Sequence, residues 1–241
     1  STAIALISGG NNIIEGNLIG TDLSGTVALC NSGNGVNTFN SSFNTIGGTT
    51  AAARNVISGN RFPGIAIAGE FSIGNLVQGN YVGTDVTGTV DLGNQSNGIF
   101  LVNGTLHVVG GTVAGAGNVV SGNNSPGIGL GFSDPSGILV QGNYIGTNAA
   151  GNASLPNLGG GIIIGGFFQL NGDPITATDN TIGGTTPAAR NVISGNLRVP
   201  GDTNPDAGNG IEIINEGSQR NKVQGNFIGL NAAGNAALPN A

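Results

Sequence analysis

The chain has 241 residues and little charge, a single cysteine, and no methionine or tryptophan. Charged residues make up 7% of it, where an ordinary soluble domain carries about 25%. Six basic residues against twelve acidic ones cannot supply the basic face that a nucleic-acid-binding protein needs. One cysteine, Cys30, excludes a disulfide scaffold and a cysteine-based zinc site. Because no apolar run approaches the roughly 18 residues of a membrane-spanning helix, we expect no membrane insertion.

Glycine is abundant instead, with 47 residues. These glycines have no period of three, which excludes collagen. The 38% of hydrophobic residues can form a core, which argues against disorder. The apolar segment Thr2–Ile7 is short and no basic residue precedes it, so we expect a mature protein or an excised segment. The acidic, Asn/Gly/Thr-rich composition favours a secreted or cell-surface location.

The main signal is an internal repeat. Residues 44–60, NTIGGTTAAARNVISGN, recur at 180–196 with one change in seventeen, and GNYVGTDVTG at 79–88 recurs as GNYIGTNAAG at 142–151. An offset of 63 residues aligns much of the first two thirds, and each block divides into a coil of 34 and a coil of 29. We predict a single domain of seven coils, at approximately 1–34, 35–63, 64–97, 98–126, 127–160, 161–209 and 210–241.

Two rows of asparagines recur once per coil. The row that closes each coil comprises Asn31, Asn60, Asn94, Asn123, Asn157, Asn196 and Asn240. The row that leads the pattern Asn-x-(Ile/Val)-Gly comprises Asn17, Asn44, Asn80, Asn143, Asn180 and Asn226, with His107 in that slot of the fourth coil. Amides in register on stacked strands can hydrogen-bond along the stack. We therefore predict two structural ladders, with His107 as a ladder member rather than a general base.

Each coil holds three short apolar stretches. In the third coil they are Gly64–Ala68, Asn75–Gly83 and Thr89–Gly93. Alternation places Ile65 and Ile67 on one face, and the pattern lacks hairpin order. The prediction is an all-β solenoid of parallel strands, adding about 4.8 Å per coil, or roughly 34 Å in all.

The motifs RNVISGN, GNYVGTD and NTIGGTT resemble the right-handed parallel β-helix repeat over essentially the whole chain. They are most similar to the Asn/Gly/Thr-rich repeats of large bacterial secreted and cell-surface proteins. The resemblance implies the fold and its handedness. Proteins with this repeat include polysaccharide lyases, epimerases, adhesins and structural arrays, so it leaves the function open.

Few residues suggest chemistry. Asp22 and Asp85 lie in equivalent turns where other coils have Asn148 and Asn231, so an Asx turn explains them, with a Ca²⁺ site as the alternative. Otherwise we expect no cofactor and no metal. Cys30 occupies a turn slot held elsewhere by glycine or proline. A row of Leu18, Tyr81, Tyr144 and Phe227 should point outward, covered by the longer turns or, alternatively, forming a binding stripe.

The sixth coil departs from the repeat with two insertions, near Phe167–Thr178 and Leu197–Gly208. Insertions in solenoids often form a binding face. The charged residues that could form it are Asp173, Asp179, Arg198, Glu216, Arg220 and Lys222. Asp202, Asp206 and Glu212 are candidates for a paired-carboxylate site. Glu212 should point outward, but its counterparts in the preceding coils are Ile163 and Gly129, so no acidic ladder forms.

Neither end of the sequence shows a capping helix or charged cap, so we expect neighbouring coils or other copies to stack on the ends. The leading hypothesis is a non-catalytic structural module of a secreted or cell-surface protein, serving as stalk, adhesin or filament. The alternatives are a polysaccharide lyase or epimerase acting at the sixth and seventh coils, and a glycan-binding module.

Overall fold

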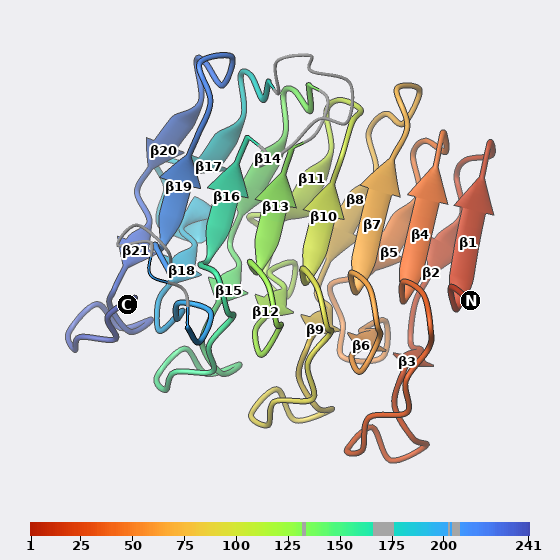
Figure 1. Cartoon of the computed structure of the whole chain (residues 1–241), viewed down its shortest axis with the longest axis horizontal. Coiled ribbons are helices and arrows are strands. Elements are labelled where there is room, and N and C mark those ends of the chain that lie inside the picture. The colour runs from red at the N-terminus through yellow and green to blue at the C-terminus, as the bar shows by residue number, and fades with distance from the viewer. Residues whose placement is uncertain (132–133, 166–175, 202, 204–207) are drawn as a thin grey trace.

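The computed structural model describes residues 1–131, 134–165, 176–201, 203 and 208–241, which wind into a right-handed parallel β-helix. Three parallel sheets of seven strands run along the molecule, and each coil contributes one strand to each sheet (Figure 1). The first sheet comprises β1 (Ile4–Ile7), β4 (Val36–Phe39), β7 (Ile65–Ala68), β10 (Ile99–Leu101), β13 (Ile128–Leu130), β16 (Ile162–Ile164) and β19 (Ile211–Ile213). The second comprises β2 (Ile13–Ile14), β5 (Thr45–Gly47), β8 (Leu76–Gln78), β11 (Val108–Gly110), β14 (Leu139–Gln141), β17 (Thr181–Gly183) and β20 (Lys222–Gln224). The third comprises β3 (Leu18–Ile19), β6 (Val56–Ile57), β9 (Tyr81–Val82), β12 (Val119–Val120), β15 (Tyr144–Ile145), β18 (Val192–Ile193) and β21 (Phe227–Ile228).

The second and third strands of a coil lie closer in sequence than we predicted. In the third coil β8 and β9 both fall within Asn75–Gly83, separated by Gly79 at φ +66°. A side chain on Gly79 would collide with the Gly48 carbonyl of the coil before, so the bend requires glycine. Thr89–Gly93 is not a third strand: it belongs to a loop that turns back on itself, with Thr84 bridging Asp91.

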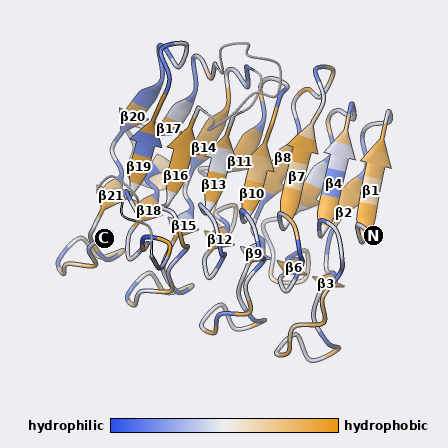
Figure 2. Cartoon of the chain, viewed as in Figure 1, coloured by the Kyte–Doolittle hydropathy of each residue, from blue (hydrophilic) through white to orange (hydrophobic). Residues whose placement is uncertain are grey.

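The interior is a stack of aliphatic side chains. Ile65, Ile67, Val77 and Val82 are all completely buried, as the alternation predicts. Most of their partners on the neighbouring strands are again Ile, Val or Leu, because the strand register aligns equivalent positions of successive coils. Ile65, for example, lies between Val36 and Ile99. Figure 2 shows the hydrophobic residues concentrated on the strands, with hydrophilic residues on β19 and β20 of the last coil.

The closing asparagines form an unbroken ladder. In each step the Nδ2 of one residue donates to the Oδ1 of the next, at 2.8–2.9 Å, from Asn31 to Asn240. Most of these residues are buried, and the amides also bond to backbone: Asn94 Nδ2 donates to the Ile57 carbonyl at 3.0 Å. The first predicted ladder is confirmed.

The second predicted row is two ladders. The one at the turns before the second sheet comprises Asn12, Asn44, Asn75, His107, Ile138, Asn180 and Asn221. The one at the turns before the third sheet comprises Asn17, Asn55, Asn80, Asn118, Asn143, Asn191 and Asn226. The single row was wrong because the same Asn-x-(Ile/Val)-Gly motif precedes the second sheet in short coils and the third sheet in long coils.

The long coils add a further stack. Their loops, 20–31, 83–94, 146–157 and 229–240, project below β3, β9, β15 and β21 (Figure 1). Each loop reaches across the intervening short coil to the next one: the N–H groups of Val86, Ala149 and Ala232 donate to the carbonyls of Gly25, Gly88 and Gly151 at 2.8–2.9 Å. The loops therefore form a row of their own, with a period of two coils.

The ladder makes a prediction about stability. Asn94→Leu removes an oxygen that accepts from Asn60 N and Nδ2, and an amide that donates to Asn123. Because these buried partners are left unpaired, we expect a loss of about 3–5 kcal/mol in the free energy of unfolding, measured by denaturant titration. Asn124→Leu, at an exposed site in the next coil, is the control. Equal stability of the two variants would show that the ladder is not structural.

Candidate functional site

Charged residues of the last two coils meet at the upper edge, defined as the turns that join each first-sheet strand to the following second-sheet strand (top of Figure 1). Arg220 Nε and Nη2 donate to the Asp179 carboxylate in a paired geometry, at 2.7 Å each. The hydrogen bonds from Arg220 lower the pKa of Asp179, and Lys222 adds a smaller effect of the same sign. Asp179 in turn raises the pKa of Arg220. Of the predicted binding face, the structure thus brings Asp179, Arg220 and Lys222 together.

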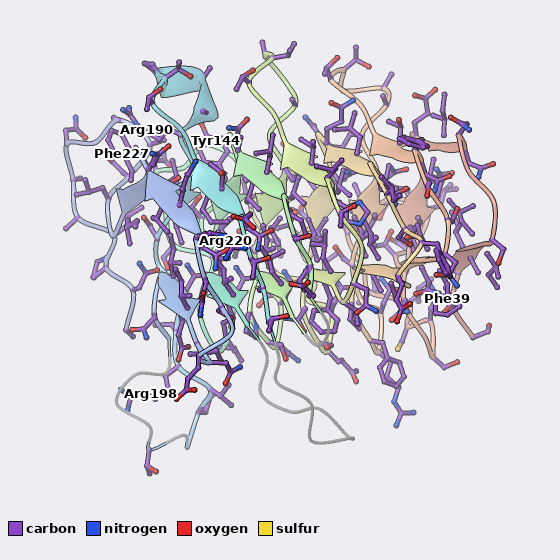
Figure 3. The ribbon with its side chains drawn as sticks, turned by 90° about the horizontal axis from the view of Figure 1, so that it is seen from above. Phe39, Tyr144, Arg190, Arg198, Arg220 and Phe227 are labelled. Carbon is purple, nitrogen blue, oxygen red and sulfur yellow. The ribbon has the colours of Figure 1, made fainter. Side chains whose placement is uncertain are left out.

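The other predicted face residues are spread out. Glu216 is exposed in the turn that also carries Arg220, and Gln219 Nε2 donates to its backbone carbonyl at 3.0 Å. Arg198 follows β18, on the way from the third sheet to the first, and Figure 3 shows it well apart from Arg220. Asp173 lies outside the described residues.

Of the three candidate carboxylates, only Glu212 lies in the described part of the chain. Glu212 lies in β19 opposite Ile163, which in turn pairs with Gly129, so the predicted register is confirmed. Asp202 and Asp206 lie outside the described residues. Within the described part of the chain, no group of three or more His, Cys, Asp or Glu residues is arranged to hold a metal ion.

The turn aspartates bind their own loops. Asp85 Oδ1 accepts from the N–H groups of Thr89 and Val90 at 3.0 Å, and the Thr87 hydroxyl donates to the same carboxylate. Burial opposes ionisation of Asp85, but the Thr87 and backbone hydrogen bonds outweigh it and lower the pKa. Asn148 accepts in the same way from Asn152 and Ala153. These contacts are those of an Asx turn.

The Asx turn can be tested at Asp85. Asp85→Ala removes the acceptor and should cost about 1–2 kcal/mol of unfolding free energy, whereas Asp85→Asn should cost little, since Asn148 accepts the same bonds. Because the folded pKa is lowered, the carboxylate's stabilisation is present above the unfolded pKa and lost as pH falls through the folded pKa. Asp85→Asn should therefore lack this loss in acid. Urea titrations at neutral and acid pH measure both effects, and equal destabilisation by Ala and Asn would contradict them.

His107 sits completely buried in the ladder before the second sheet. Its Nδ1 accepts the backbone N–H of Asn75 at 3.0 Å, and Nε2 finds no well-formed hydrogen bond among the described residues. Burial lowers the pKa of His107 to about 4, with a smaller opposing effect from the Asn103 backbone. The next coil has Ile138 at this position, so the ladder is interrupted there. A buried, neutral imidazole thus replaces an amide in this ladder.

His107 should make the fold acid-sensitive. Its folded pKa of about 4 lies below the ordinary 6.5, so the folded protein is destabilised as pH falls between these values. The shift corresponds to about 3 kcal/mol of unfolding free energy, a loss that accumulates as pH falls from the unfolded pKa to the folded pKa. His107→Asn should remove that part of the acid sensitivity, because asparagine does not titrate. Denaturant titrations of both proteins at pH 7 and pH 4 measure the difference, and parallel losses would contradict it.

The three aromatic residues of the outward row are half-buried beside the long loops, as the first of the two interpretations predicts for them, whereas Leu18 is 39% exposed. An added Cβ on Gly88 would lie 2.8 Å from the Tyr81 ring, which shows how closely the long loop packs on it. Arginines from the preceding short coils cover two of these rings. The Arg54 guanidinium lies 4.0 Å from the centre of the Tyr81 ring. The Arg190 guanidinium lies 4.0 Å from the centre of the Phe227 ring, and Figure 3 labels both residues. The arginine of RNVISGN was the available signal for this contact, and sequence reasoning missed it.

Cys30 is exposed in a hollow of about 430 Å³ between the first two long loops, which it shares with Asp91, Gln95 and Asn124. Burial raises the pKa of Asp91, and the Gly93 N–H partly opposes the shift. The Cys30 thiol donates to the Asn31 carbonyl at 3.2 Å. The residue thus has the turn position that the sequence indicates.

Comparison with known proteins supports the fold. No family model and no curated protein matches the chain. Among solved structures, the periplasmic alginate epimerase AlgG, crystallised as a double mutant, superposes with a TM-score of 0.51 at 16% sequence identity. The match covers 94% of this chain and 47% of the epimerase, so the chain spans about half the length of that enzyme. At this identity the likeness shows the parallel β-helix fold alone.

Proposed function

We propose that the chain is a non-catalytic structural repeat module of a secreted or cell-surface protein, serving as stalk, adhesin or filament. The observation that carries the proposal is that nearly every residue of the repeated motifs has a structural role. In RNVISGN at 54–60, Asn55 and Asn60 are ladder members and Ile57 is core. Ser58 Oγ donates to the Thr84 carbonyl and accepts from Gly83 N, which fixes the start of the next long loop.

The direction of the ladders supports stacking of coils on both ends. At each step between two asparagines, Nδ2 of the earlier coil donates to Oδ1 of the following coil, so the first coil presents side-chain oxygens and the last presents N–H groups. The last coil also exposes core side chains, with Val223 41% and Ile228 46% accessible. Either further coils of a longer chain or another copy can complete these faces with the same hydrogen bonds.

The described residues contain no helix long and apolar enough to cross a membrane.

The alternative is a polysaccharide lyase or epimerase acting at the last two coils. It draws on the fold shared with an alginate epimerase and on the charged residues of the upper edge. Against it, the described residues place no second carboxylate beside Glu212 on the outer face of the first sheet: its register partner there is Ile163.

Assembly state tests the structural proposal. We expect light scattering on a sizing column to give a mass that rises with concentration, and negative-stain images to show rods. Val223→Arg places a charge on the exposed end face and should give monomers, because burying it in a stack is costly. Val113→Arg, at a side position 68% exposed, is the matched control and should still assemble.

Two outcomes would count against the proposal. A wild-type protein that stays monomeric at all concentrations would contradict end-to-end stacking. Cleavage or epimerisation of a polyuronide, reduced in Glu212→Ala while folding is intact, would replace the structural function by the enzymatic one.

A further inference from the structure

A groove lies on the upper edge across the second to fifth coils, and Asp134 at its far end interacts electrostatically with Arg220 of the charged pair. It consists of two adjoining hollows of about 290 and 250 Å³ that share Glu70 and Asn103. The first is lined by Phe39, Asn40, Ala68, Gly69, Glu70, Phe71, Val102 and Asn103. The second is lined by Glu70, Asn103, Gly104, Thr105 and Asp134. The groove runs along the stack, because its lining comes from four successive coils.

The groove has a local cause in the register of the first sheet. Ala68 ends β7 and is paired with Phe39 at the end of β4, while Val102 follows β10 on the other side. A small residue between two large ones leaves a notch on the outer face. The turn that carries Glu70 and Phe71 forms one wall of it.

That turn is held by hydrogen bonds and not by packing of its side chains. Phe71 N donates to Asn40 Oδ1 at 3.3 Å, and the Ser42 hydroxyl donates to the Phe71 carbonyl at 2.8 Å. The Ser72 hydroxyl donates to the Ala68 carbonyl at 2.6 Å. The Phe71 ring is therefore presented to solvent by an ordered backbone, with 71% of the residue exposed, and Phe39 is 47% exposed. Aromatics are 5% of this sequence, so two exposed rings in one groove are a concentrated apolar surface.

The polar lining has one sign of charge. Glu70 and Asp134 are the ionisable residues of the two hollows, and both are acidic and exposed. Asn40, Asn103 and Thr105 add amide and hydroxyl groups. Arg220 of the last coil interacts electrostatically with Asp134, but its guanidinium is paired with Asp179.

We propose that this groove binds a glycan whose sugars carry protonated amines. The flat C–H face of a sugar ring can pack on an exposed phenylalanine ring. An ammonium group of the sugar is attracted to the face of that phenyl ring by a cation–π interaction. Glu70 and Asp134 supply charge-assisted acceptors for ammonium groups, and the amides match hydroxyls. A polyuronide would bring its carboxylates against Glu70, and a purely apolar partner would desolvate the Glu70 and Asp134 carboxylates without compensating their charge. This binding function goes beyond the structural proposal and does not depend on it.

Isothermal titration with a fully deacetylated chitosan tetramer, at mildly acidic pH where its amines are protonated, tests the groove. We expect binding that Phe71→Ala weakens about tenfold and Glu70→Gln about fivefold. Ala68→Leu, which fills the notch from the outer face, should abolish it. Phe62→Ala removes another exposed ring (51%) that does not line either hollow, and should bind like the wild type.

Three other ligands test which chemical group the groove recognises: the N-acetylated tetramer, an oligouronate and oligolysine. Equal affinity for the N-acetylated tetramer, or tighter binding of an oligouronate, would overturn the assignment of an amine-bearing ligand. Binding of oligolysine with the same dependence on Phe71 and Ala68 would mean that the groove takes a cationic peptide, and would overturn the glycan. No binding of the deacetylated tetramer, or binding unchanged in Ala68→Leu and Phe71→Ala, would overturn the site itself.

Discussion

The bond from one asparagine side chain to the next, repeated along the axis, is the interaction on which the rest of the structure depends. A buried amide needs partners for two donors and an oxygen, and the neighbouring coils supply most of them. Asn80 is an example: its backbone N and its Nδ2 both donate to Asn118 Oδ1 at 3.0 Å, and Nδ2 also donates to the Ile46 carbonyl. The buried amides are thus satisfied without ions, which is why so few charges suffice.

Ladders and core together divide the residues of a coil into fixed and free positions. The fixed ones are the amides, the aliphatic interior and the glycines of the bends. The free ones face outward at the strand ends and in the turns, and there the coils differ most: phenylalanines and Glu70 in the second and third coils, the Asp179–Arg220 pair in the sixth and seventh. Variation in chemistry along the upper edge costs the scaffold little, because the residues that vary there are exposed and are not members of the ladder before the second sheet.

Sequence alone predicted the parallel β-helix, the closing ladder, the aliphatic interior and the neighbours of Glu212, because each depends on period and register. It merged two ladders because one motif serves two different turns, and only strand pairing separates Asn44 from Asn17. It missed the stacking of Arg54 on the Tyr81 ring and the notch at Ala68. Both depend on which residues of neighbouring coils meet, at positions that do not repeat in every coil. The candidate acids Asp173, Asp202 and Asp206 lie outside the described residues.

The row of long loops has a consequence for how such an array changes length. Each long loop is hydrogen-bonded to the long loop two coils away. The structural repeat is therefore a pair of coils: Asn80 and Asn143, which occupy equivalent places, are 63 residues apart. Removing or duplicating a single coil would keep the ladders. It would, however, place two long loops in neighbouring coils or three coils apart, and the hydrogen bonds between the loops would be lost. A change of two coils preserves both the ladders and the loop row. The pair of coils is therefore the natural unit of duplication for the gene, and homologous arrays should differ in length by even numbers of coils.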